Sequence, residues 1–199
     1  MIMSYKPQNE NSPMGLNTLG LAHDFIRRNV KPGAFCIDAT AGKGRDTALL
    51  CQLAGQSGQV LAFDIQPEAL RQTAALLAQY GLQNAKLIED SHSNMARYAA
   101  PETVDCIVFN FGRLPGGDAR IFTTAQTSIP AVEAGLTLLK SGGVMSLSIY
   151  YGGANGYAER DALLEYLSGI DDRKASVLTA FWSNRPHDPP IQAFLWKTR

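Results

Sequence analysis

Four polar residues stand at similar places in the sequence, each closing a short apolar run. Asp38, Asp64 and Asp90 supply carboxylates that accept hydrogen bonds, and Asn110 supplies a neutral amide that both donates and accepts. If the apolar runs are parallel strands, their carboxyl ends lie along one edge of a sheet, which is where ligands bind in such folds. The spacing therefore predicts that these four side chains share one site.

A glycine-rich corner follows Asp38 in the stretch CIDATAGKGRDTALL. Gly42 and Gly44 allow a tight turn and the close approach of a ligand, and the amides that open the next helix carry a partial positive charge. The dinucleotide fingerprint G-x-G-x-x-G fits weakly, because Thr47 occupies the third glycine position. The pattern acid-x-small-x-Gly-x-Gly, through Asp38, Thr40, Gly42 and Gly44, fits S-adenosylmethionine-dependent methyltransferases of the Rossmann-like class, with Asp38 facing a cationic cofactor.

The next two carboxylates each have two interpretations. Asp64 ends the run VLAFD, where it can accept hydrogen bonds from both ribose hydroxyls of a cofactor; the alternative is a helix cap before Pro67. Asp90 can accept the exocyclic amine of adenine, or cap a helix together with Ser91. His92 is expected to be structural, or to form a shelf beneath the cofactor, rather than to shuttle protons.

Asn110 lies in VFNFGRLPGGD, where amino-group methyltransferases carry an Asn/Asp-Pro-Pro-aromatic loop. Its side-chain carbonyl can accept a proton of an amine and aim the nitrogen lone pair at a methyl group, so that alignment supplies much of the rate. This loop lacks the double proline, and a polar residue that ties the loop backbone is the alternative.

Apolar periodicity predicts the elements that position these residues. Helices are expected over residues 16–30, 45–54, 67–80, 93–99, 124–139 and 158–168, and strands over 34–39, 59–64, 85–89, 104–110, 144–150, 176–182 and 191–196. Their alternation predicts an α/β fold with a mostly parallel seven-stranded sheet, helices on both faces and a C-terminal antiparallel pair of strands. Residues 1–15 are expected to form a flexible arm, and residues 16–199 a single domain.

Net charge, cysteine spacing and the length of apolar stretches limit the classes of function but do not select one. Lysine plus arginine equals aspartate plus glutamate at 18 each, so the net charge of zero does not indicate a nucleic-acid partner, although a local basic face remains open. The cysteines Cys36, Cys51 and Cys106 lack metal-like spacing, and we expect no metal and buried thiols at Cys36 and Cys106. No stretch approaches membrane-spanning length, so a cytoplasmic protein is expected.

Several blocks together resemble one family. DATAGKGRDT, FDIQPEAL, DSHSN, FNFGRLPGGD and SNRPHDPPI are similar to the YtqB-like family of rRNA methylases, which is associated with tRNA 5-(aminomethyl)-2-thiouridine methyltransferase (MnmM), over residues 23–197. The family usually has N-L-G-Y-L-P-G-G-D, so Phe111 and Arg113 depart from it, as do Lys43 and Arg45 from its Gly-Asn-Gly-His. The resemblance implies methyl transfer from S-adenosylmethionine to the aminomethyl nitrogen of wobble uridine 34.

The expected site has three parts. Cofactor contacts are expected from Asp38, Thr40, Gly42, Lys43, Gly44, Asp46, Asp64, Ile65, Asp90, Ser91, His92, Asn110 and Phe111. Contacts to a tRNA anticodon loop are expected from Arg113, Leu114, Pro115, Thr124, Tyr150, Tyr151 and Asn184. Asn110 and Asp118 are the candidate catalytic residues: Asp118 as an acceptor of the amine's proton, or Asn110 acting only through orientation of the amine. Arg113, Arg120 and Arg185 are candidates for phosphate contacts or plain surface charge.

Other interpretations stay open at this point. The same fold can methylate rRNA or a small-molecule amine, the glycine corner can belong to an NAD-linked oxidoreductase, and a cofactor-binding protein need not be catalytic. The C-terminal strand pair leaves room for a homodimer, which nothing in the sequence requires.

Overall fold

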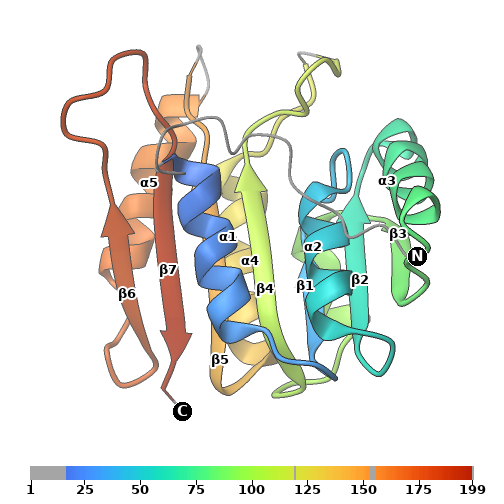
Figure 1. Ribbon diagram of the computed structural model, residues 1–199. Helices are drawn as coiled ribbons and strands as arrows, with labels where there is room; N and C mark the ends of the chain where they lie inside the picture. Colours follow the sequence, from blue (N-terminus) through green and yellow to red (C-terminus); the bar gives the residue numbers. More distant parts are fainter. Residues whose placement is uncertain (1–16, 119, 153–155, 199) are drawn as a thin grey trace.

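The computed structural model describes residues 17–118, 120–152 and 156–198 (Figure 1). The expected arm, residues 1–15, lies outside them, as does most of the glycine-rich turn before the last helix. In chain order the elements are α1 (Thr18–Asn29), β1 (Phe35–Asp38), α2 (Arg45–Ala54), β2 (Gln59–Asp64), α3 (Pro67–Gln79), β3 (Ala85–Glu89), the 3-10 helix η1 (His92–Arg97), β4 (Val104–Phe111), α4 (Ala125–Leu138), β5 (Leu139–Ile149), α5 (Gly156–Ser168), β6 (Ala175–Ala180) and β7 (Ile191–Lys197).

The sheet has seven strands in the order β3-β2-β1-β4-β5-β7-β6. Strands β1 to β5 run parallel, while β7 lies antiparallel between β5 and β6. This arrangement confirms the predicted mostly parallel sheet with a closing antiparallel pair. The strand order turns back between β1 and β4, and ligands bind beyond the strand ends at such a switch point.

Helices cover both faces of the sheet, as predicted (Figure 1). Helices α1, α2 and α3 lie on one face, and α4, α5 and η1 on the other. The middle of β4 is continuously apolar because both of its faces are buried: Cys106 and Val108 belong to the core beneath α1 and α2, whereas Ile107 and Phe109 belong to the core beneath α4. A strand buried on both faces reads as a continuous hydrophobic run.

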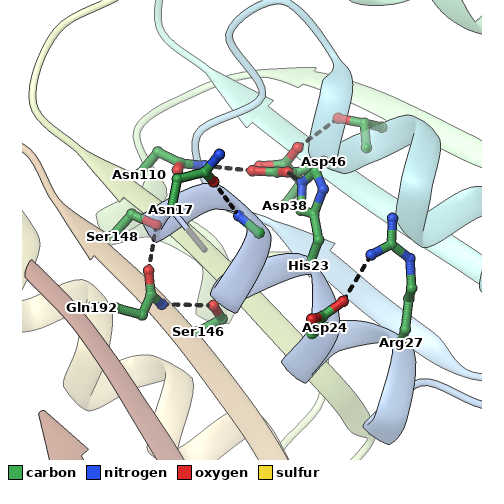
Figure 2. Close-up of polar contacts among 12 residues, drawn as sticks. Asn17, His23, Asp24, Arg27, Asp38, Asp46, Asn110, Ser146, Ser148 and Gln192 are labelled. Carbon is green, nitrogen blue, oxygen red and sulfur yellow. Dashed lines mark hydrogen bonds and ion pairs between the residues drawn. The ribbon is translucent and has the colours of Figure 1, made fainter. Parts of the chain in front are cut away.

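A buried polar ladder joins the antiparallel strand β7 to β5. Gln192 accepts a hydrogen bond from Ser148 at 2.8 Å and donates one to Ser146 at 2.9 Å (Figure 2). Because unpaired buried amides are costly, these two serines fix the position of Gln192 in an otherwise apolar layer.

The main departure from the predicted elements lies at Lys140–Gly143, expected as the turn that closes α4. The structure begins β5 at Leu139 instead. Val104 pairs with Leu139 and Cys106 already pairs with Val144, so the intervening residues bulge outward, with Gly142 at φ 77°. A glycine-rich bulge has the same composition as a turn, which is why the sequence pattern was misleading here.

Among the described helices, none is long and apolar enough to cross a membrane. The three cysteines are free and buried, as expected for Cys36 and Cys106. Within the same part of the chain, no three His, Cys, Asp or Glu side chains gather in a way that could hold a metal ion.

Candidate functional site

The site residues lie where the parallel strands end. Asp38 is the last residue of β1 and pairs with Val108 of β4, so Asn110 lies two residues further along the neighbouring strand. Asp64 ends β2, and Asp90 directly follows β3. Since these strands are parallel, all four residues lie at the same edge of the sheet, as the spacing predicted.

Asp38 is fully buried beneath the glycine corner. Its two oxygens accept hydrogen bonds from the Thr47 hydroxyl at 2.6 Å and the Thr40 amide at 3.2 Å. Burial, followed by the nearby charge of Asp46, raises the pKa of Asp38 to about 7. The expectation that Asp38 faces a cationic cofactor does not match this position, because the side chain instead holds the corner together.

The two glycines of the corner have different neighbours. A Cβ at Gly44, which has φ 79°, would lie 2.8 Å from the backbone of Thr73 in α3. A Cβ at Gly42 would lie 3.4 Å from the Leu114 side chain and 3.8 Å from the Thr40 carbonyl, both ordinary contacts. Gly44 therefore lets α3 pack against the corner, whereas Gly42 faces Leu114 in the loop after β4; Lys43 between them is exposed.

Asp64 supports the corner from β2. Its oxygens accept hydrogen bonds from the amides of Gly42 and Gln66, both at 2.9 Å. Burial raises its pKa. The side chain is half-buried and each carboxylate oxygen has a second lone pair, so it can still accept from a ligand hydroxyl. Beside it, Ile65 is 55% exposed and offers an apolar surface at the edge of the sheet.

Asp90 and Ser91 organise the start of η1. Asp90 accepts hydrogen bonds from Asn94 and Tyr98, and these bonds lower its pKa. Ser91 caps η1 by accepting from the Ser93 amide. The alternative of helix capping is thus present for Ser91, and it does not prevent either residue from meeting a ligand.

His92 is buried between aromatic rings. It lies edge-on to Phe109 and Phe111, with ring centroids 6.4 and 6.0 Å away. Burial lowers its pKa to about 4, so the ring is neutral at neutral pH. Among the described residues its Nε2 is a buried polar atom without a hydrogen-bond partner. A group that stays neutral is a poor proton shuttle, in agreement with the expected structural or shelf role.

Asn110 is held by both its backbone and its side chain. Its amide nitrogen donates to the Thr40 hydroxyl at 2.7 Å, and its Nδ2 donates to Asp46 Oδ2 at 2.7 Å. The other oxygen of Asp46 lies 2.7 Å from Nε2 of His23 in α1 (Figure 2). Three elements thus meet at one buried carboxylate in the first turn of α2.

Phe111 does not line the edge where the four polar residues meet. It is fully buried and stacks on Phe109 at 5.0 Å between centroids, so its expected ligand contact is not what the structure shows. The departure of Phe111 from the family pattern is therefore a change within the core.

The loop after β4 is anchored from below. The Gly112 amide donates to the Thr123 hydroxyl, which donates to Glu159 at 2.8 Å. Ser128 donates to the other oxygen of Glu159 at 2.5 Å. Arg113 and Pro115 are exposed on this loop, while Leu114 covers Gly42 and Thr124 precedes α4 as its N-cap residue.

Asp118 lies on the exposed part of this loop and is paired with Arg120 at 2.6 Å. The hydrogen bonds from Arg120 lower the pKa of Asp118. A carboxylate with a lowered pKa is a weaker base, so the geometry favours Asn110 over Asp118 as the group that meets an acceptor.

Aromatic residues follow β5 at the same edge. Tyr150 is 41% exposed, and burial and the Asp46 charge raise the pKa of its hydroxyl. Tyr151 is half-buried and, with Tyr157, packs against the Arg160 guanidinium at 4.8 and 4.9 Å.

The β6–β7 loop lies at this edge too (Figure 1). Asn184 is exposed on it, and Arg185 stacks on the Trp182 ring at 3.6 Å, so Arg185 is more than plain surface charge. The loop is joined to α5 by the hydrogen bond from the Tyr157 hydroxyl to Asp188 at 2.5 Å.

Two residues of this region were not predicted as part of the site. His23 lies on the buried face of α1 beside Ala22 and Ile26, and a histidine among apolar residues at helical spacing indicates a buried hydrogen-bond partner. Nothing in the sequence around Glu159 indicates that it is buried, because its hydrogen-bond partners come from α4 and the loop before it.

The comparisons with known proteins agree on the type of enzyme. A sequence model of the family described as "Putative rRNA methylase" matches residues 60–195. A chloroplastic tRNA (mnm(5)s(2)U34)-methyltransferase of Arabidopsis thaliana is 33% identical over 89% of this chain and 68% of its own length.

Solved structures agree with the family match. A structure described as a "putative rRNA-methylase" from Clostridium thermocellum is 40% identical, with a TM-score of 0.89 over 91% of this chain and 97% of that one. A Streptococcus mutans protein described as "a putative methyltransferase", solved in complex with SAH, is 31% identical, with a TM-score of 0.83 over 91% of this chain and 98% of that one. The protein is therefore an S-adenosylmethionine-dependent methyltransferase, and the chain belongs to the family described as "Putative rRNA methylase".

Proposed function

We propose that the protein N-methylates the 5-aminomethyl group of 2-thiouridine at wobble position 34 of tRNA, giving 5-methylaminomethyl-2-thiouridine. The observation that carries this proposal is the amide of Asn110, held at the end of β4 with its NH2 group on Asp46, because this leaves the carbonyl oxygen available to an amine. The Arabidopsis relative, named for the same nucleoside, supports this choice of substrate.

The polar and apolar groups at this edge of the sheet match the parts of S-adenosylmethionine that need them. We assign the ribose hydroxyls to Asp64, the adenine to the exposed surface of Ile65 and to Asp90 and Ser91, and the methionine portion to the corner at Gly42. The unpartnered Nε2 of His92 is a buried polar atom that a ligand or a water can satisfy. Asp38 supports this set indirectly, through Thr40 and Thr47.

When bound, S-adenosylmethionine would supply an electrophilic methyl group; transfer to the amine would form an N–C bond, break the C–S bond with its electrons left on sulfur, and release one proton from nitrogen. The residues of the chain do the rest by alignment. Asn110 Oδ1 accepts one N–H of the amine, which turns the lone pair toward the methyl carbon. Water at the exposed edge takes the released proton, since Asp118 is held in an ion pair by Arg120.

Single-stranded anticodon bases are recognised by stacking and scattered polar contacts rather than through a groove. We assign the wobble base to the surface around the end of β4, which is formed by Tyr150, Tyr151, the exposed loop residues Arg113 and Pro115, and the half-buried Leu114. Because the chain has no net charge, we expect it to bind tRNA through a few local contacts rather than through a broad basic surface. We include Thr124 and Asn184 among these contacts.

The test is methyl transfer by the purified protein to two tRNA preparations, one bearing 5-aminomethyl-2-thiouridine and one without modification, followed by mass spectrometry of the nucleosides. Methylation of the aminomethyl nucleoside alone is expected. Equal labelling of both tRNAs, or of neither, would reject this acceptor. The description of the family names rRNA as a second candidate acceptor, so rRNA is included as a third arm.

Asn110→Ala separates catalysis from binding. We expect the dissociation constant for S-adenosylhomocysteine to stay close to that of the wild type and turnover to fall by about 10- to 100-fold, because alignment is lost while the cofactor contacts remain. Asn184→Ala, which removes an exposed amide far along the chain, is the comparison variant for tRNA binding. Full turnover in Asn110→Ala would remove this residue from the mechanism.

A further inference from the structure

Asp46 is a buried carboxylate shared by two partners from distant parts of the chain. Its Oδ1 lies 2.7 Å from Nε2 of His23, and its Oδ2 lies 2.7 Å from Nδ2 of Asn110 (Figure 2). His23 is 2% exposed and Asp46 is 9% exposed, so water does not compete strongly for either contact. The three residues come from α1, α2 and β4.

The chemistry of these groups fixes their orientation. An ionised carboxylate only accepts hydrogen bonds, so both neighbours must donate. Burial raises the pKa of Asp46, but its contacts with His23 and Asn110 outweigh that effect and keep the pKa below its ordinary value. His23 therefore presents Nε2–H, and Asn110 presents its NH2 group. The carbonyl Oδ1 of Asn110 must then face away from Asp46.

The orientation of this amide matters for transfer to an amine. An amide carbonyl accepts an N–H of the amine and leaves the nitrogen lone pair free. A flipped amide would offer an N–H donor, which would hydrogen-bond to that lone pair and occupy the electrons that must attack the methyl carbon. The Thr40 hydroxyl fixes the backbone of Asn110 but does not choose between the two orientations of its side chain.

We propose that Asp46, itself held by His23, is a positioning residue that locks Asn110 with its carbonyl toward the acceptor amine. This inference rests on the proposed function, because the orientation matters only if the acceptor is an amine. Asp46 touches neither substrate nor cofactor in this role; it acts through Asn110.

The experiment exchanges the acid and the amide. Asp46→Asn places an amide against Asn110, so that the orientation of Asn110 is no longer enforced, and Asn110→Asp places two carboxylates in contact. The double variant Asp46→Asn/Asn110→Asp restores one acid and one amide, with an acceptor oxygen again facing the amine. Asp24→Asn is the matched control, because Asp24 is an exposed acid on the same helix as His23 and is paired with Arg27.

Both single variants are expected to lose about 10- to 100-fold in turnover, with S-adenosylhomocysteine affinity changed by less than about threefold. The double variant should recover most of that loss. Its carboxylate next to the amine raises the amine's pKa, so the rising limb of turnover against pH should shift to higher pH. Asp24→Asn should behave as the wild type.

Wild-type turnover in Asp46→Asn would overturn the proposal. If Asp46→Asn folds poorly, the double variant decides: recovered thermal stability without recovered methyl transfer would mean that these residues only hold α1 against α2. Failure of the proposed function has a different signature, because the wild type itself would then not methylate aminomethyl-bearing tRNA.

Discussion

At the scale of single residues, burial decides which ionisable groups can exchange protons with a substrate. His92 is 8% exposed and neutral near neutral pH, Asp38 is fully buried, and Asp118 is exposed but occupied by Arg120. Asn110, which has no charge to lose, is the group left at the end of β4. This arrangement favours a transfer reaction that depends on alignment more than on a strong base.

The buried ring of His92 should make stability depend on pH. Its folded pKa of about 4 lies below the ordinary histidine pKa of 6.5, so the unfolded chain binds the proton first as the pH falls. Over that interval the free energy of unfolding should fall by about 3 kcal/mol more in the wild type than in His92→Leu. Chemical denaturation of both proteins at several pH values measures the difference.

Asp38 acts in the opposite direction, because its raised pKa gives stability that is lost as the pH rises toward about 7. Both proteins keep Asp38, so its effect cancels in the comparison. Parallel pH profiles for the wild type and His92→Leu would show that the ring has the same pKa in the folded and unfolded chains, and that its surroundings are not as described.

Asp64 gives a prediction about the cofactor. Asp64→Asn removes the charge while keeping the shape, and a hydrogen bond to a charged group contributes roughly 1.5–3 kcal/mol. We therefore expect S-adenosylmethionine affinity to fall by about 10- to 100-fold in calorimetry. Glu89→Gln is the matched control, because Glu89 is an exposed acid paired with Asp64 in the strand register. Unchanged affinity in Asp64→Asn would place the ribose elsewhere.

At the scale of elements, the sequence predicts most of what positions the site. The bounds of α2, β2 and β3 are as predicted, because each is a continuous apolar or amphipathic run closed by glycine, proline or a polar residue. What periodicity cannot show is the direction in which a strand-end side chain points. Asp38 and Phe111 were both expected to face a ligand, yet both turn into the protein, since long-range packing settles that choice.

The hydrogen bonds by which Glu159 of α5 holds the loop after β4 were not predicted from the sequence, and their role can be tested. Glu159 accepts hydrogen bonds from Thr123 and Ser128, and Thr123 in turn accepts the Gly112 amide. Glu159→Gln replaces one acceptor with a donor, so we expect the loop to loosen at a stability cost of about 1–3 kcal/mol. The KM for tRNA should rise more than the dissociation constant for the cofactor changes.

Glu165→Gln serves as the control for this experiment, because Glu165 lies on the same helix and is exposed. If Glu159→Gln lowers stability but leaves the KM for tRNA at the wild-type value, the anchored loop supports the fold and is not part of the substrate surface.

At the scale of the whole molecule, one continuous sheet carries both the residues that we assign to the cofactor and those that we assign to the substrate. Strand β1 brings Asp38 beneath the glycine corner, β2 and β3 lead to Asp64 and Asp90, β4 brings Asn110, and β5 leads to Tyr150. Helix α1 packs on one face of the sheet, over β5 and β7, and contacts the site through His23. Because the contacts of the site span α1, α2 and β4, loosening one element should disturb the others.

This continuity gives a prediction about unfolding. We propose that residues 16–199 form one domain, so thermal unfolding should show a single transition whose calorimetric and van't Hoff enthalpies agree. S-adenosylhomocysteine at 100 times its dissociation constant should stabilise the folded protein by about 2.7 kcal/mol and move the whole transition upward. Strand β7 pairs with β5 from Ile191 to Trp196, so we expect the antiparallel strands to unfold together with the rest of the sheet. Two transitions, only one of which is shifted by the ligand, would instead mean that β6 and β7 unfold separately from the cofactor-binding part of the sheet.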